Sequence, residues 1–273
     1  MIDILSESLF IKQGKMFERV NDISRGFSAN YCGQVIPRES IFRITSNFAK
    51  KRGISLEVLR YPFGDEELWA FTFVKQGRVF LGVNSELPMC KQIFAVAHEL
   101  YHIHCYVEDI NTNTIANGSL LKSENFDAAF ASQEDLEANA FAGLLLMPDS
   151  SIFEQVRLYG IPRDNIDIDH VLLLMEIYAL PYKAVVLRLV ESGLIKEDVA
   201  RSLLQIDADY VSKRLSLTGI ASQWQRNTIG EEFYGSLLEN MEYNSSHELL
   251  RLSRENSDYE TLAEIRKGFC IEK

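Results

Sequence analysis

The chain has 273 residues, of which 47% are apolar, and its 28 basic and 39 acidic side chains give a formal net charge of −11. This length can bury the core of one large domain or of two small ones. The acidic charge argues against direct binding of nucleic acid, because DNA-binding surfaces are normally basic, and it is compatible with a basic protein partner.

No apolar run reaches membrane-spanning length, and the N-terminus lacks a basic segment followed by a hydrophobic stretch. The cysteines are scattered and form no Cys-x-x-Cys pair, so we expect reduced thiols. They are Cys32, Cys90, Cys105 and Cys270. These features predict a cytoplasmic protein that does not bind a membrane.

The first 40 residues predict a loop-rich segment without an assigned function, because Gly26, Gly33 and Pro37 interrupt it. Residues 39–52 then have the apolar spacing of a helix, which ends at Gly53.

Three strands are predicted next, at residues 55–61, 68–74 and 78–84, with a tight turn at Gln76 and Gly77. We expect them to form a small antiparallel sheet. The third strand could lie at the edge of a substrate cleft and hold a peptide by backbone pairing, or it could be an ordinary core strand.

The motif His-Glu-Leu-Tyr-His at residues 98–102 lies in a largely apolar segment with helical spacing. Residues four apart share one face of a helix, so His98 and His102 can direct two imidazoles at one point. Zinc accepts neutral imidazole nitrogen, and Glu99 stands where a general base for a water molecule belongs. The other interpretation is a pair of surface histidines on an amphipathic helix.

A catalytic zinc site needs a third protein ligand and leaves the fourth position for water. A second helix is predicted after Ser132, which could cap it. Glu134, Asp135 and Glu137 in its first turns are the candidate ligands, although each could be a solvated acid at a helix start. Asp135 shares a face with Asn139, whose amide could support a ligand by hydrogen bonding.

Residues 107–131 join the two helices and are predicted to be a loop, either a lid or a disordered segment. Its acids are less favoured as ligands, because a loop positions a side chain less well than a helix does. They are Glu108, Asp109, Glu124 and Asp127. On the motif helix, the thiolate of Cys105 could fill the fourth zinc position and block water, or Cys105 could be a small apolar packing residue.

The chain after Pro148 predicts helices. Residues 169–177 and 182–191 have the pattern of a helix-turn-helix pair, but Lys183 and Arg188 are the only bases of its second helix, which argues against DNA reading.

Residues 205–273 predict two or three amphipathic helices. His247 begins an incomplete copy of the zinc motif, because Arg251 cannot bind zinc. His170 has no second histidine at helical spacing, so we expect it to be structural.

The zinc motif, followed by Ala-Asn-Ala-Phe-Ala at residues 138–142 and Leu-Leu-Met-Pro at residues 145–148, resembles the ImmA/IrrE family of metallopeptidases. The resemblance extends over residues 41–195 and is strongest over residues 97–148. It implies a zinc-dependent endopeptidase with a zincin-like fold.

In that family the third ligand is a Glu three residues before the Ala of Ala-Asn, and Asp135 holds this position here. The resemblance therefore implies that His98, His102 and Asp135 bind Zn²⁺ and that Glu99 is the catalytic base. Tyr101 stands where the family usually has Gly, so we expect altered packing or a different cleft shape.

The resemblance also implies a protein substrate, because family members cleave helix-turn-helix repressors and so release genes of mobile elements or of stress responses. The alternative is a non-proteolytic, zinc-containing regulatory protein that binds a repressor, toxin or antitoxin. We expect an α+β protein with an N-terminal segment (1–40), a zinc metallopeptidase domain with a small antiparallel sheet (41–204) and a helical C-terminal extension (205–273).

Overall fold

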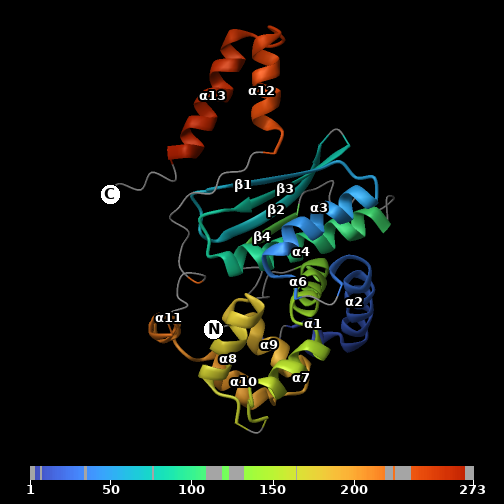
Figure 1. The fold of residues 1–273 in the computed structure, drawn as a ribbon, viewed down its shortest axis with the longest axis vertical. Coiled ribbons are helices and arrows are strands. Elements are labelled where there is room, and N and C mark those ends of the chain that lie inside the picture. Colours follow the sequence, from blue (N-terminus) through green and yellow to red (C-terminus); the bar gives the residue numbers. More distant parts are fainter. Residues whose placement is uncertain are drawn as a thin grey trace.

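A computed structural model of the protein describes residues 4–6, 8–33, 36–75, 77–108, 119–122, 132–163, 165–218, 224 and 235–267. Its helices are α1 (Leu9–Lys12), α2 (Gly14–Phe27), α3 (Ile41–Lys51), α4 (Met89–Glu108), α6 (Gln133–Leu146), α7 (Asp149–Leu158), α8 (Ile168–Tyr178), α9 (Tyr182–Glu191), α10 (Glu197–Leu204), α11 (Ala208–Leu217), α12 (Leu237–Ser246) and α13 (Leu252–Lys267). Its strands are β1 (Leu56–Tyr61), β2 (Leu68–Lys75), β3 (Arg78–Asn84) and β4 (Ser119–Lys122). The fold is α+β, as predicted, with the sheet at one end of a helical body (Figure 1).

The four strands form one mixed sheet in the order β1-β3-β2-β4. β1 and β3 are parallel, whereas β2 runs antiparallel to both β3 and β4. The prediction of a purely antiparallel sheet was therefore wrong. The chain reverses direction between β1 and β2 and again between β2 and β3, and β3 lies between the other two, so β1 and β3 run the same way. The predicted turn also contains Gln76, which lies outside the described residues.

The position of β3 also corrects its suggested role as a strand at the edge of a substrate cleft. Both of its sides are occupied, by β1 and by β2, so its backbone groups already pair with neighbouring strands. Among the strands that the structure describes, β1 and β4 form the two edges of the sheet.

Helix α4 lies between the sheet and α6, in contact with β2, β3 and α6. Its apolar residues from Ile93 to Ile103 are buried on all sides, as expected for a helix segment without a solvent-facing stripe. The facing helix α6 has fully buried alanines at positions 138 and 142. Such small side chains allow two helices to approach closely, which brings their polar residues within reach of one another.

The prediction of a loop-rich segment over the first 40 residues was wrong, because helix α2 occupies much of it. Phe17, Val20 and Phe27 lie in the main hydrophobic core, and α2 packs against α6. The three- and four-residue spacing of Phe17, Val20, Ser24 and Phe27 gives a helix one buried face. Burial of this face outweighs the low helix preference of Gly26.

The α8–α9 pair packs into the helical body, and the two helices are bent by 101° relative to each other. Arg188 on α9 is only 1% exposed. It donates hydrogen bonds to the carbonyl of Met147 (3.1 Å), to Glu191 (2.7 Å) and to Asp149. One of the two bases considered for DNA contact therefore ties α9 to the end of α6.

None of the described helices is by itself long and apolar enough to cross a membrane, although the bent α8–α9 pair together satisfies that length and composition test.

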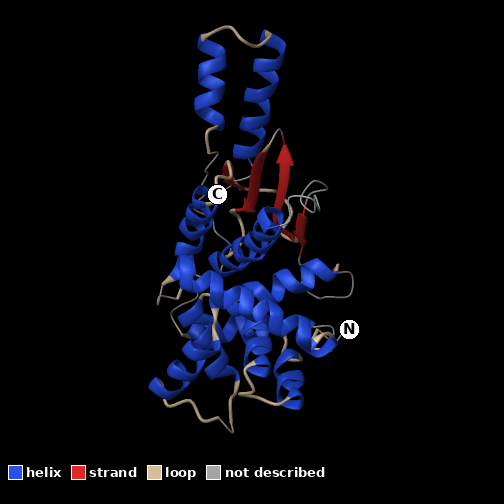
Figure 2. Ribbon diagram, turned by 90° about the vertical axis from the view of Figure 1, so that its right-hand side faces the viewer, coloured by secondary structure: helices blue, strands red, loops and turns tan. Residues whose placement is uncertain are grey.

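Helices α12 and α13 form a hairpin beyond the sheet (Figures 1 and 2). Ser236, just before α12, donates hydrogen bonds from its amide and its hydroxyl to Glu57 of β1 (3.2 and 2.9 Å). Met241 and Leu262 make a small cluster with Tyr61, separate from the main core. The predicted helical C-terminal extension is thus present in the described residues.

Candidate metal centre

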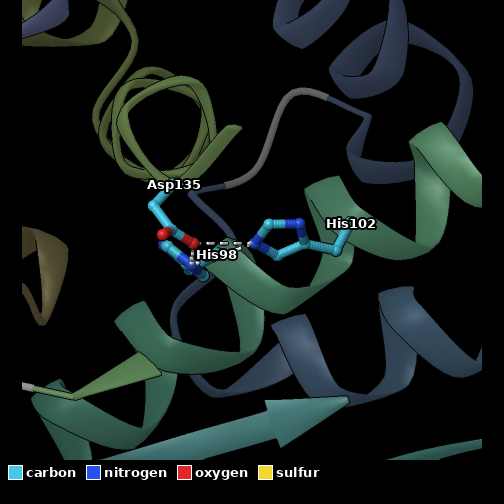
Figure 3. A group of neighbouring side chains, drawn as sticks. All are labelled: His98, His102 and Asp135. Atoms are coloured by element: carbon cyan, nitrogen blue, oxygen red, sulfur yellow. Dashed lines mark hydrogen bonds and ion pairs between the residues drawn. The ribbon is translucent and has the colours of Figure 1, made fainter. Parts of the chain in front are cut away.

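Three side chains from α4 and α6 converge at the contact between these helices (Figure 3). His98 and His102 lie one turn apart on α4, and their Nε2 atoms are 3.2 Å apart. Oδ1 of Asp135, in the first turn of α6, lies 3.8 Å from Nε2 of His98 and 3.6 Å from Nε2 of His102. Three ligand atoms within 4.8 Å of one another could hold one metal ion.

The Nδ1 atoms of both histidines face acceptors on α6. Nδ1 of His98 donates to Oδ1 of Asn139 (2.8 Å), and Nδ1 of His102 donates to Oε1 of Glu134 (2.7 Å). These bonds place a proton on each Nδ1, so that both Nε2 atoms face the common point. The helix contact therefore sets the tautomers that metal binding requires.

Asp135 uses its two carboxylate oxygens for different purposes. Oδ2 accepts hydrogen bonds from the amide and the hydroxyl of Ser132 (3.0 and 2.8 Å), and Oγ of Ser132 accepts one from the amide of Asp135 (3.1 Å). This reciprocal arrangement is a capping box, which satisfies two free amides at the helix start. It holds the carboxylate so that Oδ1 faces the histidines.

The two histidines and Asp135 shift one another's pKa values. Burial, together with the adjacent His102, lowers the pKa of His98 to about 3, so His98 is neutral. Burial by itself also lowers the pKa of His102, but the Asp135 and Glu134 carboxylates outweigh it and raise that pKa to about 10. Burial raises the pKa of Asp135, yet His102 and Ser132 outweigh it and lower that pKa to about 2. The two imidazoles together thus carry one extra proton, on His102, whose positive charge faces the negative Asp135 carboxylate. A metal cation could take the place of this proton.

Glu99 follows His98 on α4 and is fully buried. Its negative charge is close enough to His102 to raise the pKa of that imidazole. Glu99 therefore acts electrostatically on the centre without belonging to the group of three ligand atoms.

Within the described part of the chain, the other candidate ligands do not join this group. The carboxylate of Glu137 accepts hydrogen bonds from Tyr101 (2.7 Å) and from Gln133 (2.9 Å). The thiol of Cys105 lies next to Tyr101, and burial raises its pKa to about 11, so it is protonated rather than a thiolate. Asp109, Glu124 and Asp127, and the side chain of Glu108, lie outside the described residues.

The two remaining histidines considered in the sequence lie at helix ends. His170 takes part in a capping box with Asp167 at the start of α8, with its Nδ1 2.6 Å from Oδ1 of Asp167. His247 follows the last residue of α12. Neither histidine belongs to the group at the metal centre, as expected.

Two features of the site were missed in the sequence. The interpretation of Ser132 as a cap did not extend to Asp135, although Ser-x-x-Asp before an apolar run is a signal for a capping box. Glu134 was considered only as a ligand, whereas it lies on the opposite side of the His102 ring from Asp135. No spacing rule distinguishes these two neighbouring acids, because the side chain of each can turn toward either nitrogen.

Comparison with known families gives a match to Peptidase_M78, the IrrE N-terminal-like domain, over residues 50–190. The match covers just over half of the 273 residues and contains both helices of the metal centre. Neither a search of curated proteins nor a search of solved structures gives a match. The chain therefore belongs to the Peptidase_M78 family, which supports a metallopeptidase-type function.

Proposed function

We propose that this protein is a zinc-dependent endopeptidase, and that its substrate is a helix-turn-helix transcriptional repressor whose cleavage derepresses mobile-element or stress-response genes. The observation that carries the proposal is the convergence of His98, His102 and Asp135 on a helix turn that also carries the buried Glu99. A purely structural metal site would not need that buried carboxylate next to it.

The donor set fits zinc. Zinc prefers nitrogen and carboxylate ligands at about 2.0–2.2 Å in tetrahedral geometry, for which two ligand atoms lie about 3.4 Å apart. The Nε2 atoms are 3.2 Å apart, and Oδ1 of Asp135 is 3.6 and 3.8 Å from them. Three protein ligands also leave one tetrahedral position for water, which is the pattern of catalytic sites.

Zinc, when bound, supplies a Lewis acid that polarises a peptide carbonyl and lowers the pKa of water. Glu99 is the proposed general base. It accepts a proton from the attacking water and passes this proton to the nitrogen of the leaving amine. Asn139 and Glu134 hold a proton on each Nδ1, so that both Nε2 atoms can bind the ion once His102 has lost its second proton.

The choice of a repressor as substrate rests on the ImmA/IrrE resemblance and on charge. The chain has a net charge of −11, which attracts a basic partner such as a DNA-binding protein.

The substitution Glu99→Gln tests the proposal, because it keeps size and hydrogen-bonding capacity but removes the base. Wild type and Glu99→Gln are each incubated with helix-turn-helix repressors encoded nearby, and cleavage is measured by the mass of the fragments and by release of operator DNA. We expect both proteins to bind zinc and the repressor, with cleavage lost in Glu99→Gln and in wild type treated with a chelator.

A different pair of results would contradict the proposal. If wild type binds a repressor tightly without cutting it, and Glu99→Gln relieves repression equally well, then the protein acts by binding and the endopeptidase proposal is wrong.

A further inference from the structure

The two histidines of the metal centre have unequal partners behind them. Nδ1 of His98 donates to the neutral amide of Asn139, whereas Nδ1 of His102 donates to the carboxylate of Glu134. A hydrogen bond to an ionised acceptor is shorter and stronger than one to a neutral acceptor. His102 is therefore held more firmly than His98, and by a group that carries charge.

The place of Glu134 in the fold adds to this difference. Glu134 and Asp135 are consecutive residues in the first turn of α6, yet they approach opposite sides of the same ring. Oε1 of Glu134 faces Nδ1, and Oδ1 of Asp135 faces Nε2. The two nitrogens of the His102 imidazole point in divergent directions. With Nε2 facing the ion, the Glu134 carboxylate lies at the other nitrogen, so it cannot bind the same ion together with Asp135 in this arrangement.

We infer that Glu134 is a positioning residue of the metal centre: its carboxylate fixes the tautomer and orientation of the His102 ring so that Nε2 faces the ion and Asp135. This inference rests on the proposed zinc site. Carboxylates that accept the second ring proton of a ligating histidine raise the basicity of that ligand, and their loss typically weakens metal binding 10- to 100-fold.

Glu134 is also accessible from outside. Its side chain is 33% exposed, and it lines a groove of about 810 Å³ between α2, α4 and α6 together with Tyr101 and Glu137. His102 itself is almost completely buried. The carboxylate thus connects a buried ligand to an open groove, and a substitution at residue 134 need not disturb the packing of α4.

Glu137 provides a matched control. It lies one turn further along α6, lines the same groove and carries the same charge, but its carboxylate accepts from Tyr101 rather than from a histidine. Glu137→Gln therefore removes the same charge from the same groove without removing a hydrogen-bond acceptor of either imidazole.

The test measures Zn²⁺ affinity by competition with a chromogenic chelator for wild type, Asp135→Asn, Glu134→Ala, Glu134→Gln and Glu137→Gln. The visible spectrum of the Co²⁺-loaded proteins gives a second readout, because it depends on ligand geometry. We expect Glu134→Ala to lose about 10- to 100-fold in affinity with an altered Co²⁺ spectrum. Glu134→Gln should recover most of this loss, since its amide oxygen still accepts the Nδ1 proton, and Glu137→Gln should match wild type.

Three outcomes would contradict the inference. Equal Zn²⁺ affinity in wild type and Glu134→Ala would overturn the role of Glu134 while leaving the proposed zinc site intact. A loss in Glu134→Gln as large as that in Asp135→Asn would make Glu134 a ligand instead. Absence of Zn²⁺ binding by wild type would overturn the proposed site and this inference together.

Discussion

Helices α4 and α6 hold their metal-directed side chains in different ways. His98 and His102 project from the middle of a buried helix and are 0% and 3% exposed, so the packing of the whole core fixes them. Asp135 lies in the first turn of α6 with its side chain 16% exposed, and a single hydrogen-bonded cap fixes it. The proposed ligands from α4 thus depend on the global fold, whereas the proposed ligand from α6 depends on a local structure that can be weakened separately.

The largest effect should come from the α4 side. His102→Ala removes one of two imidazoles, and we expect Zn²⁺ affinity to fall by more than the roughly 100-fold upper range for losing an outer hydrogen-bonding partner. Chelator competition measures the loss. His170→Ala is the control, since His170 lies at the start of α8. Unchanged zinc content in His102→Ala would remove α4 from the metal centre.

A smaller loss is expected on the α6 side. Asp135→Asn retains the size of the side chain and an oxygen for the cap, but it removes the negative charge that faces both imidazoles. We expect Zn²⁺ affinity to fall by about 100-fold, the upper end for loss of an outer partner, because Asn weakens a ligand but keeps an oxygen that can still face the ion. Glu137→Gln should bind zinc like wild type. If titrations give the reverse order, the ligand is Glu137 and Asp135 serves the cap alone.

The smallest effect isolates the local structure. Ser132→Ala deletes the cap hydroxyl while leaving every proposed ligand in place. Loss of such a cap costs about 1 kcal/mol, which corresponds to about fivefold in affinity if capping and metal binding are fully coupled. Thermal unfolding and zinc titration measure the two quantities in parallel.

The matched control for this change is Asp207→Ala, which removes the cap of α11. It should lower the melting temperature by a similar amount and leave Zn²⁺ affinity unchanged. Equal zinc affinity in Ser132→Ala and wild type would show that packing, rather than the cap, positions Asp135.

The sequence predicted the local features of this molecule better than those that depend on packing between distant segments. The motif helix and the common face of His98 and His102 followed from helical spacing, which is short-range geometry. The convergence with Asp135, on a separate helix, followed from the family resemblance. The parallel pairing of β1 with β3 was missed, since strand order is decided by packing between distant segments. Helix α2 was missed because Gly26 and Gly33 were given more weight than the spacing of Phe17 and Val20.

The capping box has a consequence for the kind of ion that the centre accepts. The Asp135 side chain has one torsion fewer than Glu, and its Oδ2 is already held by Ser132. Less rotational freedom then remains to be lost when an ion arrives, which offsets the shorter reach of Asp. The same restraint disfavours large ions, because an ion with longer ligand distances could be accommodated only by pulling the carboxylate away from the helix start. Discrimination by ionic radius would thus be set by a serine that never touches the ion.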